Sequence, residues 1–504
     1  MNGKTALTLL DLLEHGAPEA PALLAPGRTV LTFRDVRGQV LRLAEKLAAL
    51  GLGRGDRIAI AMENGPELVL SLLAAAVCGT AVPLNPKYRA AEFGFYYEDG
   101  NVRALIAAPG SVSEAYAAAR PETLVIHAET DASGRLALEP VGPVGRPRSL
   151  EAPGPDDVAI LLHTSGTTRN PKRVPIRQRN LAASVANVVR ACALTPADVS
   201  LCVMPLFHIH GIVASMLAPL ASGGAVVCPQ GFDAMRFWGW VEEFRPTWYS
   251  AVPAIHQLLL SRADRYADLI LGNPFRFIRS CSAPLPPMVV GRMEDVFGAP
   301  VTEAYGMTEA THQLTSNPLP PGLRKAGAVG FGIGVQVAVM DEAGALLPPD
   351  MHGEVVVRGL NVVDGYENDK EANETTFVRG WFRTGDQGVI DADGYLAITG
   401  RLSERINRGG EKISPLEIDH VLLRHPSVAE ALAFGVPHRS LGEDVHAAVV
   451  LRSAVTEQAL RAHCAEFLAD FKVPRRIHFL DSLPYVGSGK LRRNVMVKAL
   501  ALAG

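Results

Sequence analysis

The stretch His163-Thr-Ser-Gly-Thr-Thr-Arg-Asn-Pro-Lys-Arg173 follows the apolar run Val158-Ala-Ile-Leu-Leu162, which predicts a buried strand. It gathers four hydroxyl side chains, one glycine, three cationic side chains and a histidine. Such a loop can present backbone N–H groups, hydroxyls and positive charge to a polyanion. It does not match the P-loop pattern, because the second glycine and the Gly-Lys-Ser/Thr ending are missing. An ordinary polar turn is the alternative for this stretch alone.

Length and composition indicate a large globular protein. The chain has 504 residues, of which 48% are hydrophobic and 20% charged. A net charge of −3 disfavours a protein that coats nucleic acid or anionic membrane. The six cysteines show no metal-ligand spacing, and neither a signal-peptide pattern nor an apolar run long enough to span a membrane is present. These features predict a cytoplasmic protein without a nucleic-acid or membrane partner.

Short β-type runs alternate with helical stretches from residue 1 to about residue 400, which predicts α/β layers. Examples are strands at 57–62 and 80–83, with a helix at 66–77 between them. Residues 128–157 are rich in glycine, proline and charge and predict surface connections. A charged segment at 401–410 suggests a boundary. We therefore predict a large N-terminal α/β domain over 1–400 and a small, mobile C-terminal α+β lid domain over 401–504.

Two further motifs carry groups suited to a nucleotide. Thr308 beside Glu309 can hold a phosphate oxygen and Mg²⁺ respectively, because magnesium favours carboxylate and phosphate oxygens. A helix-capping role for Thr308 is the alternative. Asp386 follows a glycine on an expected tight turn, where a carboxylate can accept from two vicinal ribose hydroxyls. The alternative is an Asx-turn that closes a hairpin.

Two glycine-rich segments lie in or near the proposed lid. Gly409 and Gly410, close to Arg401, permit large backbone changes or close approach to an extended ligand, although an exposed linker would look similar. Lys490 ends Gly487-Ser-Gly-Lys490 and can carry a mobile positive charge to developing phosphate charge. A solvated lysine near the chain end is the alternative.

Two histidines stand in Met204-Pro-Leu-Phe-His-Ile-His-Gly211. His208 and His210 would lie on the same face if this segment were extended. A zinc pair lacks a third ligand at suitable spacing, so we expect the wall of a pocket. A histidine packed in the core is the alternative.

The order and spacing of these motifs resemble the adenylate-forming superfamily of acyl-CoA synthetases, peptide-synthetase adenylation domains and luciferases. The likeness extends from about residue 25 to the chain end. It rests on Thr164-Ser-Gly-Thr-Thr168 with Pro171-Lys172, Tyr305-Gly-Met-Thr-Glu309, Thr384-Gly-Asp386, Gly400-Arg401 and Gly487-Ser-Gly-Lys490. Within the superfamily, stretches at 205–211, 280–283, 307–312 and 406–415 look like the oxalyl-CoA synthetase group.

The resemblance implies an AMP-forming acid–thiol ligase that uses ATP, Mg²⁺ and coenzyme A. A small carboxylic acid, with oxalate fitting best, would form an acyl adenylate and pyrophosphate, and coenzyme A would then displace AMP. The implied catalytic residues are Lys490, Thr308, Glu309 and His208, with Glu309 as the Mg²⁺ ligand. The implied contacts to ATP and coenzyme A are Thr164, Ser165, Gly166, Thr167, Thr168, Lys172, Ser282, Ala283, Pro284, Tyr305, Asp386, Arg401, Gly409 and Gly410. The implied acid contacts are His208, His210, Ser282 and His312.

Three positions depart from the superfamily pattern. Arg169 and Arg173 stand where glycine is common, and we predict φ below zero at both, because a positive φ would strain an arginine. Ser403 stands at the presumed hinge, where Asp or Lys is usual. Two other functions remain open: a free-standing adenylating enzyme that serves a carrier protein or an amine, and an ATP-binding regulator without turnover. Monomer and homodimer both remain open.

Overall fold

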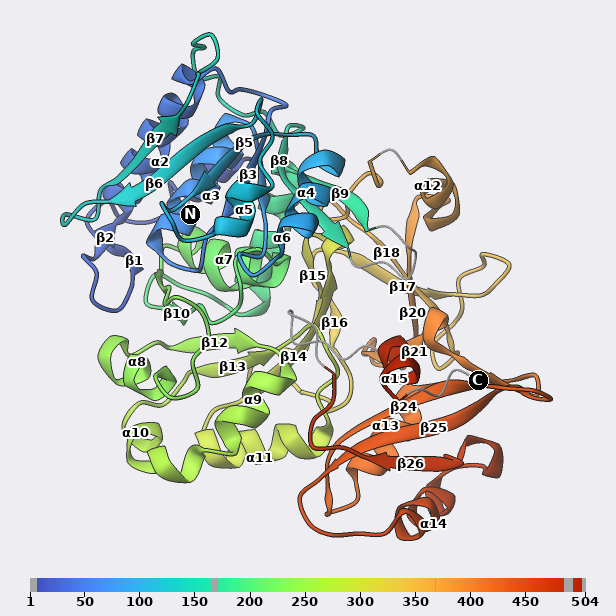
Figure 1. The fold of residues 1–504 in the computed structure, drawn as a ribbon. Coiled ribbons are helices and arrows are strands. Elements are labelled where there is room, and N and C mark those ends of the chain that lie inside the picture. Colours follow the sequence, from blue (N-terminus) through green and yellow to red (C-terminus); the bar gives the residue numbers. More distant parts are fainter. Residues whose placement is uncertain (1–6, 165–170, 368, 485–492, 501–504) are drawn as a thin grey trace.

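The structure is a computed structural model that describes residues 7–164, 171–367, 369–484 and 493–500. In these residues the strands form four sheets (Figure 1). Three of them use residues up to Arg401, and the fourth begins at Ile406.

The first sheet has seven strands in the order β7-β6-β5-β3-β4-β8-β9. Its central strands are parallel, as expected for α/β layers, while β7 and β9 pair antiparallel at the two edges. The expectation of surface connections over 128–157 is wrong in part, because β6 and β7 form a hairpin there. In β7 the buried Leu136 and Leu138 alternate with the less buried Ala137 and Glu139. The bounds are β3 Arg57–Ala61, β4 Thr80–Pro83, β5 Val102–Ala107, β6 Leu124–Thr130, β7 Leu136–Val141, β8 Val158–Thr164 and β9 Lys172–Arg177.

The second sheet has nine strands in the order β16-β15-β14-β13-β12-β10-β11-β1-β2. Strands β10 to β14 run parallel, and β15 turns back antiparallel to β14. The bounds are β1 Pro21–Leu24, β2 Leu31–Thr32, β10 Val199–Leu201, β11 Ala225–Val227, β12 Trp248–Ala251, β13 Phe277–Ser280, β14 Val301–Met307, β15 His312–Ser316 and β16 Phe331–Gly332.

Helices α3 (Pro66–Cys78) and α6 (Gln178–Ala191) belong to the large core that contains residues of both sheets. Helix α3 begins at Pro66, a residue suited to the first turn of a helix. Every residue from Leu68 to Cys78 is buried, because this helix is apolar on all sides. Helix α6 contacts β9 of the first sheet and β15 of the second. It therefore connects the phosphate-loop edge of one sheet to the β14–β15 hairpin of the other.

The remaining helices up to residue 404 cover the outer faces or connect strands (Figure 1). Helix α2 begins with a capping box in which Thr32 and Asp35 satisfy each other's backbone N–H groups. The bounds are α1 Leu9–Leu12, α2 Phe33–Ala49, α4 Ala90–Asp99, α5 Ser113–Ala117, η1 His210–Leu217, α7 Ala218–Ala221, α8 Phe237–Phe244, α9 Pro253–Leu260, η2 Ala263–Tyr266, α10 Ala267–Gly272, α11 Pro287–Phe297, η3 Thr308–Ala310, α12 Lys370–Thr376 and η4 Leu402–Glu404.

The third sheet orders its strands β17-β18-β20-β19, with β21 also paired to β20. The expected tight turn at Asp386 is wrong, because Asp386 lies inside the long strand β20. The ladder between β18 and β20 shifts register at this point, and Gly385 takes a φ of 72°, as a β-bulge requires. The bounds are β17 Gln336–Met340, β18 Gly353–Arg358, β19 Phe377–Val378, β20 Trp381–Ile390 and β21 Leu396–Arg401.

The C-terminal sheet orders its strands β23-β22-β25-β24, with β26 also paired to β25, and packs around its own apolar cluster. The domain boundary between residues 400 and 401 stays a prediction. The bounds are β22 Ile406–Arg408, β23 Glu411–Ile413, α13 Pro415–Leu423, β24 Val428–His438, β25 Gly442–Leu451, α14 Glu457–Phe467, η5 Asp470–Lys472, β26 Arg476–Phe479 and α15 Arg493–Ala499.

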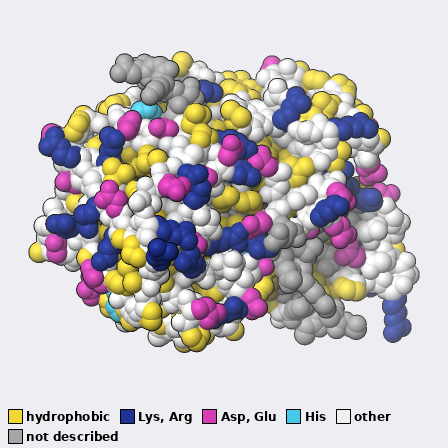
Figure 2. Space-filling model, turned by 90° about the horizontal axis from the view of Figure 1, so that it is seen from above, with side chains coloured by type: hydrophobic (Ala, Val, Ile, Leu, Met, Phe, Trp, Pro, Cys, Tyr) yellow, Lys and Arg dark blue, Asp and Glu magenta, His cyan; other side chains and the backbone are white. Residues whose placement is uncertain are grey.

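The surface carries both signs of charge. Figure 2 shows basic and acidic side chains interspersed over one face of the molecule. None of the helices within the described ranges is long and apolar enough to cross a membrane.

A buried carboxylate in β14 makes stability depend on pH. Burial raises the pKa of Glu303 to about 7, although the Gly327 N–H donates to its carboxylate. The folded state therefore keeps a proton that the unfolded state has already lost, so stability is full below pH 4.5 and falls until about pH 7.

We predict that Glu303→Gln removes this loss, which amounts to about 3 kcal/mol. The difference between the thermal unfolding midpoints at pH 5 and pH 8 should be smaller in the variant than in the wild type. Glu342→Gln, at an exposed turn position, is the matched control and should unfold like the wild type. If the midpoints of the wild type and Glu303→Gln depended equally on pH, the raised pKa of Glu303 would be contradicted.

Candidate active site

The β14–β15 hairpin carries four of the expected site residues. Tyr305 lies in β14, Thr308 and Glu309 form part of η3, and His312 begins β15. Gly306 allows the two strands to approach closely, because a Cβ there would lie 1.5 Å from the His312 carbonyl oxygen. Gly306 therefore fixes the distance between the residues expected to bind the nucleotide and His312, which is expected to bind the acid.

Tyr305, Asp386 and Arg401 form one hydrogen-bonded group across two sheets. The Tyr305 hydroxyl donates to Asp386 Oδ2 at 2.6 Å, and Arg401 Nε donates to Asp386 Oδ1 at 2.8 Å. Asp386 and Arg401 are direct partners in the β20–β21 ladder. An ionised carboxylate has about four acceptor positions, so Asp386 can still accept from two further hydroxyls.

Tyr305 and Arg401 both keep their protons near neutral pH. Burial, followed by the charge of Asp386, holds the pKa of Tyr305 well above its usual value, so the phenol stays a donor. The Asp386 carboxylate raises the pKa of Arg401, which stays cationic. The group therefore presents a carboxylate with one fixed neutral donor and one fixed cationic donor.

A second group joins Glu309 to the end of the phosphate loop through Tyr366. The Tyr366 hydroxyl donates to Glu309 Oε1 at 2.9 Å, and Lys172 Nζ lies 4.6 Å above the Tyr366 ring. Burial and the neighbouring Glu309 raise the pKa of Tyr366, which keeps its proton. Glu309 is only 7% exposed, so this donor limits where the carboxylate can point.

The phosphate loop connects two paired strand ends. Thr164 ends β8 and faces Lys172 at the start of β9 in the antiparallel ladder. The other expected loop contacts, Ser165, Gly166, Thr167 and Thr168, lie outside the described residues, as does Arg169. Thr308 is half-buried at the start of η3, beside Glu309.

Arg173 and His163 belong to a structural network next to the loop. Arg173 lies in β9 without a positive φ, which confirms the prediction for that residue. It donates to the Asp99 carbonyl oxygen at 2.8 Å and lies 3.7 Å from a Glu367 carboxylate oxygen. His163 Nε2 is 2.9 Å from Asp99 Oδ2, while burial lowers the pKa of His163. These contacts attach β8 and β9 to α4.

Three of the four expected acid-binding residues, His210, Ser282 and His312, meet in one cluster. His210 Nδ1 lies 3.0 Å from Ser282 Oγ, and His210 Nε2 lies 2.7 Å from Ser250 Oγ. The His210 and His312 rings stack with centroids 5.0 Å apart. The structure thus brings His210, Ser282 and His312 together, as the sequence predicted, and adds Ser250.

The backbone around this cluster occupies unfavourable conformations. Ser282, Thr311 and His312 have φ values of 75°, 49° and 86°, in the region that favours glycine. Residues held this way cost stability and persist where the surrounding structure fixes them, commonly at binding sites. Ala283 and Pro284, which follow Ser282, are half-buried and exposed respectively.

The segment that carries His208 and His210 is not extended, so the condition for placing both on one face is not met. His210 begins the π-helix η1, whose wider turns recur at functional sites. Gly211 is required there, because a Cβ would lie 2.3 Å from the Pro205 carbonyl oxygen. His208 precedes the helix in a turn, with its ring 4.6 Å from that of Phe207.

The structure describes the residues expected in the lid only in part. Gly409 and Gly410 make the turn between β22 and β23 with φ values of 62° and 96°. Lys490 lies outside the described residues. Arg493, three positions later, donates to Asp419 Oδ2 at 2.6 Å and to Glu404 Oε2 at 2.9 Å. This arginine fixes the start of α15 beside the presumed hinge residue Ser403.

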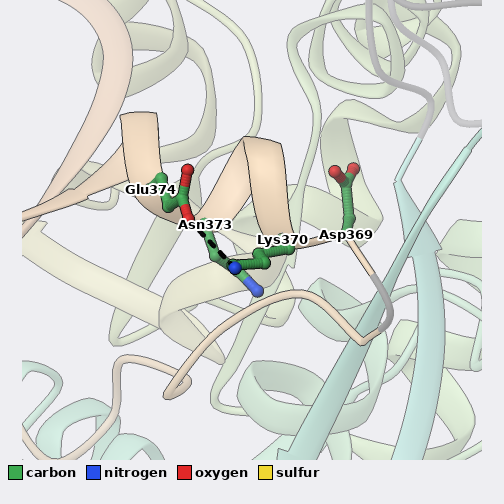
Figure 3. Close-up of a pocket in the computed structure, with 4 residues that line it drawn as sticks. All are labelled: Asp369, Lys370, Asn373 and Glu374. Atoms are coloured by element: carbon green, nitrogen blue, oxygen red, sulfur yellow. Dashed lines mark ion pairs between the residues drawn. The ribbon is translucent and has the colours of Figure 1, made fainter.

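A hollow of about 610 Å³ lies at α12 (Figure 3). Asp369, Lys370, Asn373 and Glu374 line it, and Lys370 pairs with Glu374 at 3.7 Å. It is an open surface feature without a converging set of donors.

Sequence reasoning missed Tyr366, Ser250 and Arg279. Tyr366 lies 57 positions from the carboxylate that it contacts, and Ser250 lies 40 positions from His210. Arg279 donates to Ser250 Oγ at 3.1 Å. It follows two apolar residues in strand β13, and a cation at that place in the sequence was a signal that could have found it.

Two family models match the chain. Residues 14–367 match the AMP-binding enzyme family, and residues 417–490 match the AMP-binding enzyme C-terminal domain. The oxalate–CoA ligase of Arabidopsis thaliana is 43% identical over 97% of this chain and 98% of its own. The sulfoacetate–CoA ligase of Cupriavidus necator is 39% identical over 94% of each chain.

Solved structures agree with these matches. ATP-bound MatB from Rhodopseudomonas palustris shares the fold with a TM-score of 0.87 and 29% identity, covering 98% of this chain and 99% of that one. The predicted α/β body with a C-terminal domain, the adenylate-forming enzyme fold, is confirmed. Because the family match covers most of the chain and the similarity extends over nearly its whole length, the chain belongs to the AMP-binding enzyme family.

Proposed function

We propose that this protein activates oxalate with ATP and transfers the acyl group to coenzyme A. The enzyme class is that of its family, an AMP-forming acid–CoA ligase. Full-length similarity to an oxalate–CoA ligase supports oxalate as the acid. The observation that carries the proposal is the compact polar cluster of His210, Ser282 and His312, because a very small diacid needs short donors rather than an apolar tunnel.

The nucleotide would lie between the two hydrogen-bonded groups of the site. Asp386 accepts from the ribose hydroxyls while Tyr305 and Arg401 hold its carboxylate in place. Thr164 and Lys172, at the two ends of the loop, and Thr308 contact the phosphate chain. Ser165, Gly166, Thr167 and Thr168 are proposed as further phosphate contacts.

Mg²⁺ fits beside Glu309. Its carboxylate and the phosphate oxygens of ATP form the oxygen-rich set that Mg²⁺ prefers, with few protein ligands. The Tyr366 hydroxyl occupies one side of the carboxylate and leaves further acceptor positions free for the ion. When bound, the ion would neutralise charge on the phosphate oxygens.

The reaction then has two steps. A carboxylate oxygen of the acid attacks the α-phosphorus of ATP, and the bond to pyrophosphate breaks. Lys490 and Lys172 stabilise the developing negative charge. After the lid rotates, the deprotonated sulfur of coenzyme A attacks the acyl carbon, and AMP leaves with the shared electron pair. Gly409 and Gly410 line the thiol's path, and His208 controls entry to the acid subsite.

Pyrophosphate release with ATP tests the proposal across oxalate, malonate, sulfoacetate and acetate, with and without coenzyme A. We expect oxalate to give the highest kcat/KM and to consume the thiol. Lys490→Ala should lower the rate of adenylate formation at least a hundredfold, because it removes a transition-state charge. If none of these acids supports pyrophosphate release, the small-acid assignment is wrong.

The same assay separates the alternatives. Pyrophosphate release without thiol consumption would indicate a free-standing adenylating enzyme that serves another acceptor. Equally slow release by wild type and Lys490→Ala would indicate an ATP-binding regulator.

Tyr366→Phe tests whether the Tyr366 hydroxyl positions the proposed Mg²⁺ ligand. Loss of a hydrogen bond to a carboxylate costs about 1.5 kcal/mol, so KM for Mg·ATP should rise about tenfold. Tyr395→Phe is the matched control, because its hydroxyl donates to the Leu323 carbonyl oxygen and contacts none of the proposed ligands. Unchanged KM for Mg·ATP in Tyr366→Phe would mean that Glu309 is held by its backbone alone.

A further inference from the structure

Arg279 is a fully buried cation beneath the acid subsite. It lies in β13 with 0% exposure. Its Nη1 donates to Ser250 Oγ at 3.1 Å, and its Nη2 donates to Gln313 Oε1 at 2.7 Å. Its Nε is buried and has no hydrogen-bond partner within the described part of the chain. Both partners are neutral side chains.

The charge of Arg279 is uncompensated among the residues that the structure describes, where none of its contacts is a carboxylate. Glu303, the buried acid of β14, pairs with Ser280 and therefore faces the other side of the sheet. Burial raises the pKa of the nearby Cys192 thiol to about 11, so that group is neutral as well. A buried charge without a counter-ion is costly and calls for a reason.

Arg279 also sets the direction of the hydrogen bonds that lead to the acid subsite. Arginine can only donate, so Ser250 Oγ accepts from Arg279. Of the contacts of Ser250 in the described ranges, His210 Nε2 is the one that can accept the Ser250 proton. His210 then carries its own proton on Nδ1 and donates it to Ser282 Oγ. The Ser282 hydroxyl proton is left to point at a ligand.

We propose that Arg279 is a positioning residue that makes the acid subsite select dianionic acids over monoanionic ones. It does so through its uncompensated positive charge and through the Ser250–His210–Ser282 chain, which aims a donor at the second carboxylate. This inference rests on the proposed function. The second carboxylate of a diacid stays ionised and desolvated throughout adenylation, so it benefits from a nearby buried cation in a way that a neutral group does not.

The test compares oxalate with oxamate, which has the same size and one charge fewer. The measured quantity is the ratio of the oxamate inhibition constant to the oxalate KM. Gln313→Glu places a carboxylate against Arg279 without creating a cavity and compensates its charge. We expect this variant to fold and to lower the ratio about tenfold, mainly through a higher oxalate KM. Gln313→Met, neutral and of similar size, is the matched control and should keep the ratio within threefold.

Arg279→Lys and Arg279→Met extend the test to the residue itself. Arg279→Lys keeps the charge, so the ratio of the oxamate inhibition constant to the oxalate KM should stay close to the wild-type value. Arg279→Met removes the charge and should lower that ratio as Gln313→Glu does. A purely structural role for Arg279 would leave the ratio unchanged in Gln313→Glu, and that result would overturn this inference alone. A wild-type protein that releases no pyrophosphate with oxalate would instead refute the proposed function and this inference with it.

Discussion

The hydrogen bond from Tyr305 to Asp386 connects the two parts of the molecule on which the candidate site depends. Tyr305 belongs to the nine-stranded sheet and Asp386 to the sheet that leads into the C-terminal residues. Asp386 also pairs with Arg401, the last residue of β21, so one carboxylate links the body to the segment where the presumed hinge begins. On the proposed function, a ribose bound at Asp386 would contact both parts at once and would couple nucleotide binding to the position of the proposed lid.

The β14–β15 hairpin imposes the second constraint. Gly306 brings its strands together so that Glu309, at the tip, and His312, on the returning strand, cannot move independently. The positive φ at Thr311 and His312 is the cost of this geometry. The proposed metal ligand and the proposed acid contact therefore share one rigid element, which suits a reaction whose two substrates must meet at a single phosphorus atom.

Local patterns predicted much of the fold and the main groups of the site. Apolar runs gave β3, β4 and α3 almost to the residue, because burial on both sides leaves a continuous apolar signal. The β6–β7 hairpin, the strand at Asp386 and the π-helix at His210 were missed, since each depends on long-range packing rather than on local composition. Tyr366 and Arg279 were missed for the same reason. The cytoplasmic location and the domain boundary stay predictions.

The central claim is that this site joins a carboxylate of the acid to the α-phosphorus of ATP. The most direct test follows an oxygen atom from the acid into AMP. The protein would be incubated with ATP, coenzyme A and oxalate labelled with ¹⁸O, and the AMP analysed by mass spectrometry. The account predicts one labelled oxygen in each AMP, because the attacking oxygen stays on phosphorus when coenzyme A displaces the acyl group. Label in inorganic phosphate with unlabelled AMP would contradict it.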